Sequence, residues 1–215
     1  MAKSEFNKNV FLLASGTAFA QALPIVISPI LTRIYTPSDF GTLSLFIAIV
    51  SIFASIANGR YELAIMLPKK DENAIKVLSL TLIINLITSI SLMLVIIFFH
   101  DQIIEYFSDN NLSNWLYFIP LVVFLQGAFN SFNYFHLRKK RYTILRNIRI
   151  AKSVSLTIPQ VLLGLSKQGP FGLIIGEIIS SLFSLLYFAK IFFKKSYLRL
   201  SFSFNDFSNL ATKYK

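Results

Sequence analysis

The sequence predicts an all-α membrane protein with six transmembrane helices, and two observations support this fold class. The 215-residue chain is 54% hydrophobic and only 14% charged, whereas soluble domains carry about 25% charged residues. Its apolar residues are also gathered into six long segments that contain almost no charge. A helix of roughly 20 apolar residues crosses a bilayer core, and backbone groups in lipid must pair within such a helix. The predicted spans are Val10–Thr32, Thr42–Leu67, Ala74–His100, Trp115–Leu137, Ile150–Ser166 and Phe171–Phe193.

The first predicted span contains two prolines, Pro24 and Pro29. Each proline lacks the N–H group that a helical hydrogen bond requires. We therefore expect this helix to bend between Gln21 and Pro29. Because Gln21 is polar as well, we also expect the helix to face the bundle rather than lipid.

The next spans differ in how clearly they are predicted. The second follows a turn-rich segment at residues 35–41, which is expected to form an outside loop. The third is the most apolar, with Asn85 as its one strongly polar residue. The fifth is short, and it has Lys152 near its start and Pro159 near its middle.

The distribution of positive charge predicts the topology. Apart from Arg33, Arg60 and Lys167, the 21 lysines and arginines belong to the N-terminus, the second and fourth loops, the C-terminal tail and the adjoining ends of the spans, where Lys76, Lys152 and Lys190 lie. This asymmetry predicts a multi-pass membrane protein with both termini in the cytoplasm. The net charge of +11 is therefore expected to meet anionic membrane lipids rather than nucleic acid, above all at residues 138–149.

Motifs of soluble enzymes are missing from the sequence. There is no cysteine, which excludes disulfides and thiolate metal sites. The chain also contains no phosphate-binding glycine-rich loop, no His-Glu-x-x-His and no Gly-x-Ser-x-Gly. The sequence therefore gives no sign of a soluble enzyme and predicts no cofactor or metal.

Three charged residues within the spans are candidates for function, since charge in the membrane is costly. Arg60 is expected about 10 Å inside the second span, where it either binds an anionic substrate or anchors the helix end by reaching the surface. Glu62 and Glu177 are candidates for ion coupling. Their alternative role is structural, as carboxyl groups that reach the surface or are held by a neighbouring helix.

Amide side chains form a second group of candidates. Gln126, Asn130 and Asn133 recur on one face of the fourth span, and Gln21 lies in the first. These side chains either form the wall of a polar cavity or join helices by hydrogen bonds. Both interpretations keep this face of the fourth span away from lipid.

Four segments resemble a known transporter family. They are NVFLLASGTAFAQ at residues 9–21, PILTRIYTPSDFG at 29–41, GRYELAIMLP at 59–68 and GPFGLIIG at 169–176. In these segments the chain resembles the oligosaccharide flippases of the MOP exporter superfamily, which includes O-antigen (Wzx-type) transporters. The segment at 29–41 is the most specific of the four.

The resemblance implies export of an undecaprenyl-pyrophosphate-linked oligosaccharide by rocking of two lobes, driven by an ion gradient. Polysaccharide assembly proteins are its implied partners. Residues 1–195 are similar to the N-terminal lobe of such a repeated or inverted MOP/MATE-like bundle. Residues 196–215 would form a basic cytoplasmic tail that leads toward a second lobe.

Other functions stay open at this stage. A multidrug or metabolite exporter of the related MATE class would bind organic cations, for which Arg60 has the wrong sign. A membrane-embedded polymerase or glycosyltransferase would require a larger outside loop. A non-transporting scaffold for polysaccharide assembly is the remaining alternative.

The topology is testable with single cysteines, because the chain has none of its own. Outside loops are predicted near Arg33–Gly41, His100–Asn114 and Lys167–Pro170. In intact cells, an impermeant thiol reagent should label Asn110→Cys and leave Lys140→Cys unlabelled. Labelling of Lys140→Cys from outside would contradict the predicted topology.

Overall fold

The computed structural model describes residues 2–107 and 110–194 and is helical, with no strand within those ranges. The all-α fold class is confirmed. The predicted tail at 196–215 lies outside the described residues. The helices are α1 (Ala2–Ile34), α2 (Pro37–Ile56), α3 (Tyr61–Ala64), α4 (Asp71–Phe107), α5 (Asn110–Leu116), α6 (Ile119–Arg138), α7 (Tyr142–Gly164) and α8 (Phe171–Lys194).

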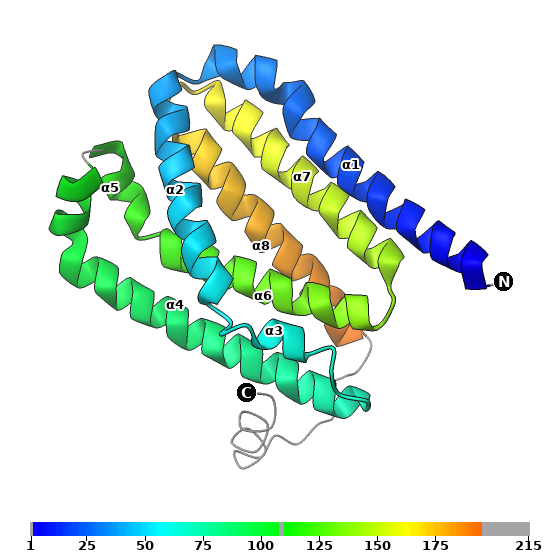
Figure 1. Ribbon diagram of the computed structural model, residues 1–215. Coiled ribbons are helices and arrows are strands. Elements are labelled where there is room, and N and C mark those ends of the chain that lie inside the picture. Colours follow the sequence, from blue (N-terminus) through cyan, green and yellow to red (C-terminus); the bar gives the residue numbers. More distant parts are fainter. Residues whose placement is uncertain (1, 108–109, 195–215) are drawn as a thin grey trace.

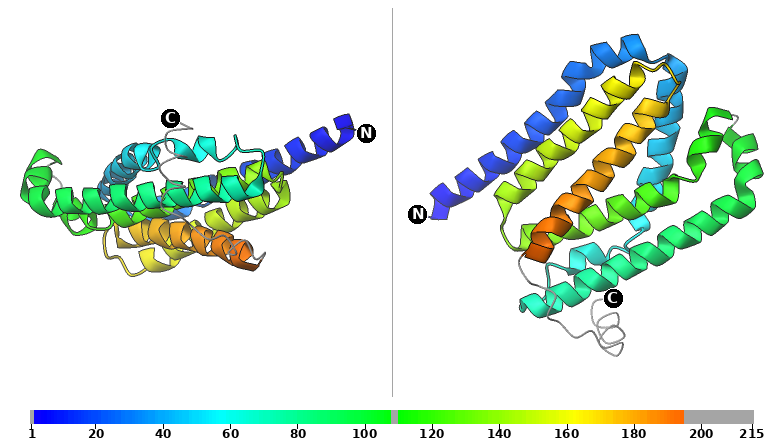
Figure 2. Two further views of the ribbon diagram at one scale, coloured as in Figure 1. Left: turned by 90° about the horizontal axis from the view of Figure 1, so that it is seen from below. Right: turned by 180° about the vertical axis from the view of Figure 1, so that it is seen from behind.

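The helices pack as neighbours across a flat bundle. Helices α1, α7 and α8 lie side by side, and α4 runs along α6 on the far side (Figure 1). Helix α2 crosses between these two groups and contacts both α6 and α8. Figure 2 shows how thin the bundle is when it is seen from below. Helices α1 and α4 are therefore the two edges of the bundle.

Helix α1 behaves only partly as predicted. It is continuous through Pro24 and Pro29, and it changes direction toward its C-terminal end (Figure 1), as expected from the prolines. The expectation that it faces the bundle throughout is wrong. Ile25 and Val26 are each 71% exposed, because α1 packs mainly against the single helix α7.

The second predicted span is not one helix. Helix α2 begins at Pro37 because Thr36 and Asp39 form a capping box, so most of the expected outside loop is helical. Helix α2 ends at Ile56, and the backbone then takes positive φ angles at Gly59 (55°) and Arg60 (63°) before α3. Glycine favours this conformation, which a continuing helix cannot adopt.

Other helix boundaries also differ from the prediction. Helix α4 runs past His100 to Phe107, with a non-helical residue at Phe99, so part of the expected outside loop is helical. Trp115 belongs to α5, and α6 starts at Ile119, where a proline stands in its first turn. Helix α7 starts at Tyr142, eight residues before the predicted span, because the basic segment is helical too.

Several helices are suited to a membrane, which makes the chain a membrane protein. Among the described residues, four helical segments are long and apolar enough to cross a bilayer. Helices α6 and α7 are long enough but more polar, so six spans stay a prediction. The four segments are Val10–Ile34, Pro37–Ile56, Asp71–Phe107 and Phe171–Phe192.

A buried polar cluster joins three helices around Gly127 of α6. The Asn58 side chain, just after α2, donates to the Gly127 carbonyl oxygen at 2.9 Å. Asn85 of α4 donates to the Phe124 carbonyl oxygen at 2.8 Å. The Asn85 carboxamide lies so close to Gly127 that a Cβ there would be 2.5 Å from its oxygen. Only glycine allows this approach, and such contacts join helices in lipid.

Gly127→Ala should therefore destabilise the protein by about 1–3 kcal/mol, since overpacking must displace Asn85. Thermal unfolding in detergent measures this effect. Gly41→Ala is the matched control, because nothing lies within 4 Å of a Cβ at that helical position. Equal unfolding temperatures for the two variants would contradict the packing described around Gly127.

Candidate functional site

A cavity with several polar and charged side chains in its wall lies between α1, α6 and α7. It has a volume of about 450 Å³, within the usual range for small-ligand sites. Its walls combine positive charge, amides, a hydroxyl pair and apolar side chains. The residues that line it are Thr17, Ala20, Gln21, Pro24, Phe129, Asn133, Arg149, Lys152, Ser153 and Leu156.

Helix α7 contributes both positive charges. Arg149 and Lys152 are three residues apart, so they share one helix face. Lys152 is ten residues from the first residue of α7 and twelve from the last, or about 15 Å and 18 Å along the axis. A lysine at the middle of a membrane helix costs roughly 2.5–3.5 kcal/mol unless water or an anion meets it.

Specific contacts hold these cations at the cavity wall. The Arg149 guanidinium donates to the Thr17 hydroxyl of α1. The Lys152 ammonium lies 4.9 Å from the centre of the Phe129 ring of α6, which is a cation–π distance. Ser153 follows Lys152 on α7, and its hydroxyl donates to the Ala20 carbonyl oxygen of α1 at 2.7 Å. The contacts between α1 and α7 thus form around the cavity.

The composition of the cavity suits an anion. No acidic side chain is among the described residues that line it. Arginine binds phosphate oxygens through paired N–H donors, whereas lysine supplies a compact charge. The amides of Gln21 and Asn133 add donors and acceptors that suit hydroxyl groups.

The structure brings together only some of the predicted site residues. Gln21 of α1 and Asn133 of α6 face each other across the cavity. Gln126 and Asn130 are half-buried on α6 but do not line it. Arg149 and Lys152 were missed, because Arg149 was interpreted as part of the basic segment that sets the topology and Lys152 as a weakness of the fifth span. Their spacing with Ser153 on one helix face was the signal that could have identified them.

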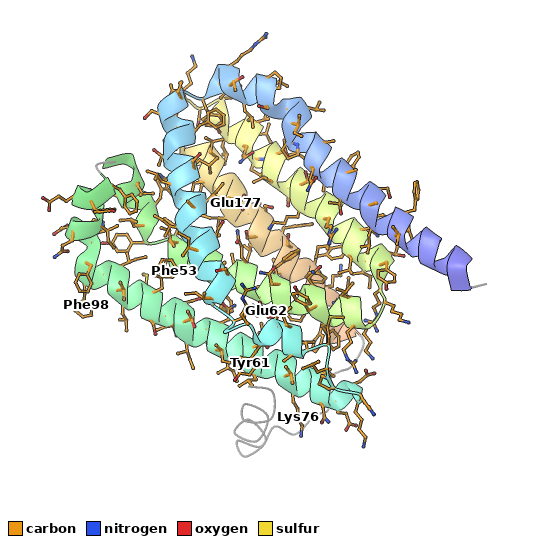
Figure 3. All side chains as sticks on the ribbon, viewed as in Figure 1. Phe53, Tyr61, Glu62, Lys76, Phe98 and Glu177 are labelled. Atoms are coloured by element: carbon orange, nitrogen blue, oxygen red, sulfur yellow. The ribbon has the colours of Figure 1, made fainter. Side chains whose placement is uncertain are left out.

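The three predicted charged residues lie elsewhere. Arg60 is exposed at the start of α3, beyond the end of α2, and therefore not inside a continuous span. Glu62 on α3 and Glu177 on α8 lie on separate elements (Figure 3). Glu62 is only 7% exposed, and its Oε2 has no hydrogen-bond partner among the described residues. Their functional roles stay predictions.

Polar contacts fix the helices at both ends of the site. Beyond α1, the Tyr35 hydroxyl donates to the Gln160 carbonyl oxygen of α7 at 2.6 Å. Burial, followed by the negative charge of Asp39, raises the pKa of Tyr35 to about 12. At the opposite end, Arg138 pairs with Asp71 at 2.5 Å and donates to the Pro68 carbonyl oxygen at 2.7 Å.

Comparison with known proteins identifies the family. A family model described as polysaccharide biosynthesis protein matches residues 30–212. The chain therefore belongs to the polysaccharide biosynthesis protein family, in agreement with the broader part of the resemblance seen in the sequence. No curated protein and no solved structure matched the chain. Its apolar helices fit a membrane protein of polysaccharide biosynthesis.

Water access to the cavity is testable with single cysteines on α6. Asn133→Cys should react with a small charged thiol reagent at least tenfold faster than Ser131→Cys, because Asn133 lines the cavity and Ser131 is fully buried. Reaction rates are measured on the purified protein by mass spectrometry. Equal rates at the two positions would show that the cavity is closed to water.

Proposed function

We propose that this protein exports a lipid-linked oligosaccharide, and that the α1–α6–α7 cavity receives its anionic pyrophosphate. The observation that carries the proposal is the pair of cations, Arg149 and Lys152, on one wall of this cavity. The family match supports the setting, since polysaccharide repeat units must cross a membrane before they reach the cell surface.

The substrate class follows from what the cavity offers. The Arg149 guanidinium would pair with phosphate oxygens, and the Lys152 ammonium would neutralise the remaining charge. Gln21 and Asn133 would bind sugar hydroxyls on the facing wall. The apolar tail of an undecaprenyl carrier would stay in lipid, which the exposed apolar side chains of α1 would contact.

The proposal includes a membrane topology. Helices α6 and α7 would cross the inner membrane together with the four apolar segments, with both termini in the cytoplasm. The protein would then act as a transporter of the flippase type rather than as an enzyme. A multidrug exporter of the MATE class would face repulsion between organic cations and the two positive side chains of the cavity.

Ion coupling would involve Glu62. Glu62 is buried, and its Oε2 has no hydrogen-bond partner among the described residues, so this oxygen is not engaged by another side chain. Glu62 follows the break between α2 and α3 closely. Binding of a coupling ion at this carboxyl group would therefore alter the packing at this break.

The proposal predicts that Arg149→Gln and Lys152→Gln each reduce export of surface polysaccharide at least tenfold, because each removes one cavity charge while retaining much of the side chain. The measurement is surface polysaccharide in a full-length context, normalised to the amount of protein in the membrane. Lys70→Gln is the control, since it removes an exposed charge outside the cavity.

Arg60→Ala separates this proposal from the expectation that Arg60 binds the anionic substrate. Normal export by both cavity variants, combined with loss of export by Arg60→Ala at normal abundance, would overturn the cavity assignment. Substrate binding would then belong to Arg60.

A further inference from the structure

The opposite face of α7 carries a second, apolar groove. This groove lies between α7 and α8, which run side by side in Figure 1, and has a volume of about 550 Å³. Three of its apolar residues, Ile158, Ile179 and Phe183, are between 38% and 53% exposed. Among the residues that line it are Asn147, Ile150, Val154, Ile158, Ile179 and Phe183.

The groove has the length of one lipid chain. It extends from Asn147 to Pro159 along α7, and these twelve helical steps correspond to about 18 Å. One leaflet of a bilayer core is about 15 Å thick. An acyl chain of the leaflet nearest Asn147 would therefore fill the groove from end to end.

One end of the groove is positively charged. The Arg146 side chain lies against Gly16 of α1, and its guanidinium donates to the side-chain oxygen of Asn147 through Nε at 3.2 Å and Nη2 at 3.0 Å, which keeps this cation beside the end of the groove. Lys190 of α8 follows Phe183 by seven residues and so lies on the same helix face, where it is exposed. Because α7 and α8 are antiparallel, Arg146 and Lys190 flank the same end.

We propose that this groove is a binding site for an anionic phospholipid of the cytoplasmic leaflet, with one acyl chain along α7 and the phosphate between Arg146 and Lys190. The positive charge at this end of the groove favours an anionic headgroup, and the apolar walls favour an acyl chain. The site requires α7 and α8 to lie in the membrane as proposed. It does not require the α1–α6–α7 cavity to bind an oligosaccharide carrier.

Native mass spectrometry of the purified full chain tests the site with phosphatidylglycerol and phosphatidylethanolamine of identical chains. The wild-type protein should retain phosphatidylglycerol at least fivefold better. Arg146→Gln combined with Lys190→Gln should remove this preference, and Val154→Trp should reduce retention of both lipids by filling the groove. The matched controls are Lys70→Gln for the charge and Leu94→Trp for an exposed apolar position on α4.

Equal retention of the two lipids by the wild-type protein would overturn the proposal. So would an unchanged preference in the double variant, or retention of an undecaprenyl phosphate that phosphatidylglycerol cannot displace. Export of surface polysaccharide by the variant with both Arg146→Gln and Lys190→Gln separates the lipid site in the groove from the substrate site in the cavity. Loss of the lipid preference with normal export supports the groove site, whether or not the cavity binds the oligosaccharide carrier.

Discussion

The structure depends on how α7 carries two positive charges into an apolar bundle. Arg149 and Lys152 lie seven and ten residues after the first residue of that helix, and charges at such depth are costly if α7 spans the membrane as proposed. Helices α1 and α6 cover this face with a hydroxyl, an aromatic ring and amides, and leave a cavity between them. The other face of α7 is apolar and lines the groove beside α8. A single amphipathic helix thus carries a charged face toward the cavity and an apolar face toward the groove.

Buried polar contacts explain why the helices adopt one arrangement. Apolar burial does little to join helices in lipid, so close packing and hydrogen bonds must do so. Asn58 and Asn85 bind α6 around Gly127. The Ser180 hydroxyl of α8 donates to the Lys152 carbonyl oxygen at 2.9 Å, which fixes α7 beside the cavity. Most of these contacts end on backbone atoms, so they specify the register of the helices.

Much of the fold could be predicted from the sequence, because apolar length and helical propensity are local properties. Helix α8 matches its predicted span within one residue. The break after α2 was missed, because Gly59 and Arg60 interrupt a sequence that is apolar on both sides. The cavity was harder to predict, since it requires knowing which helices are neighbours. Gln21 and Asn133 were found as polar residues in apolar segments, whereas Lys152 was interpreted as a weakness of its span.

Binding of an isoprenoid pyrophosphate to the purified protein tests the central claim most directly, because it isolates the anion site from transport. The account predicts that Arg149→Gln and Lys152→Gln each weaken the affinity for farnesyl pyrophosphate at least fivefold, a loss of about 1 kcal/mol. Farnesol should bind both variants and the wild-type protein equally. Equal affinity of the wild-type protein and both variants for the pyrophosphate would contradict the account.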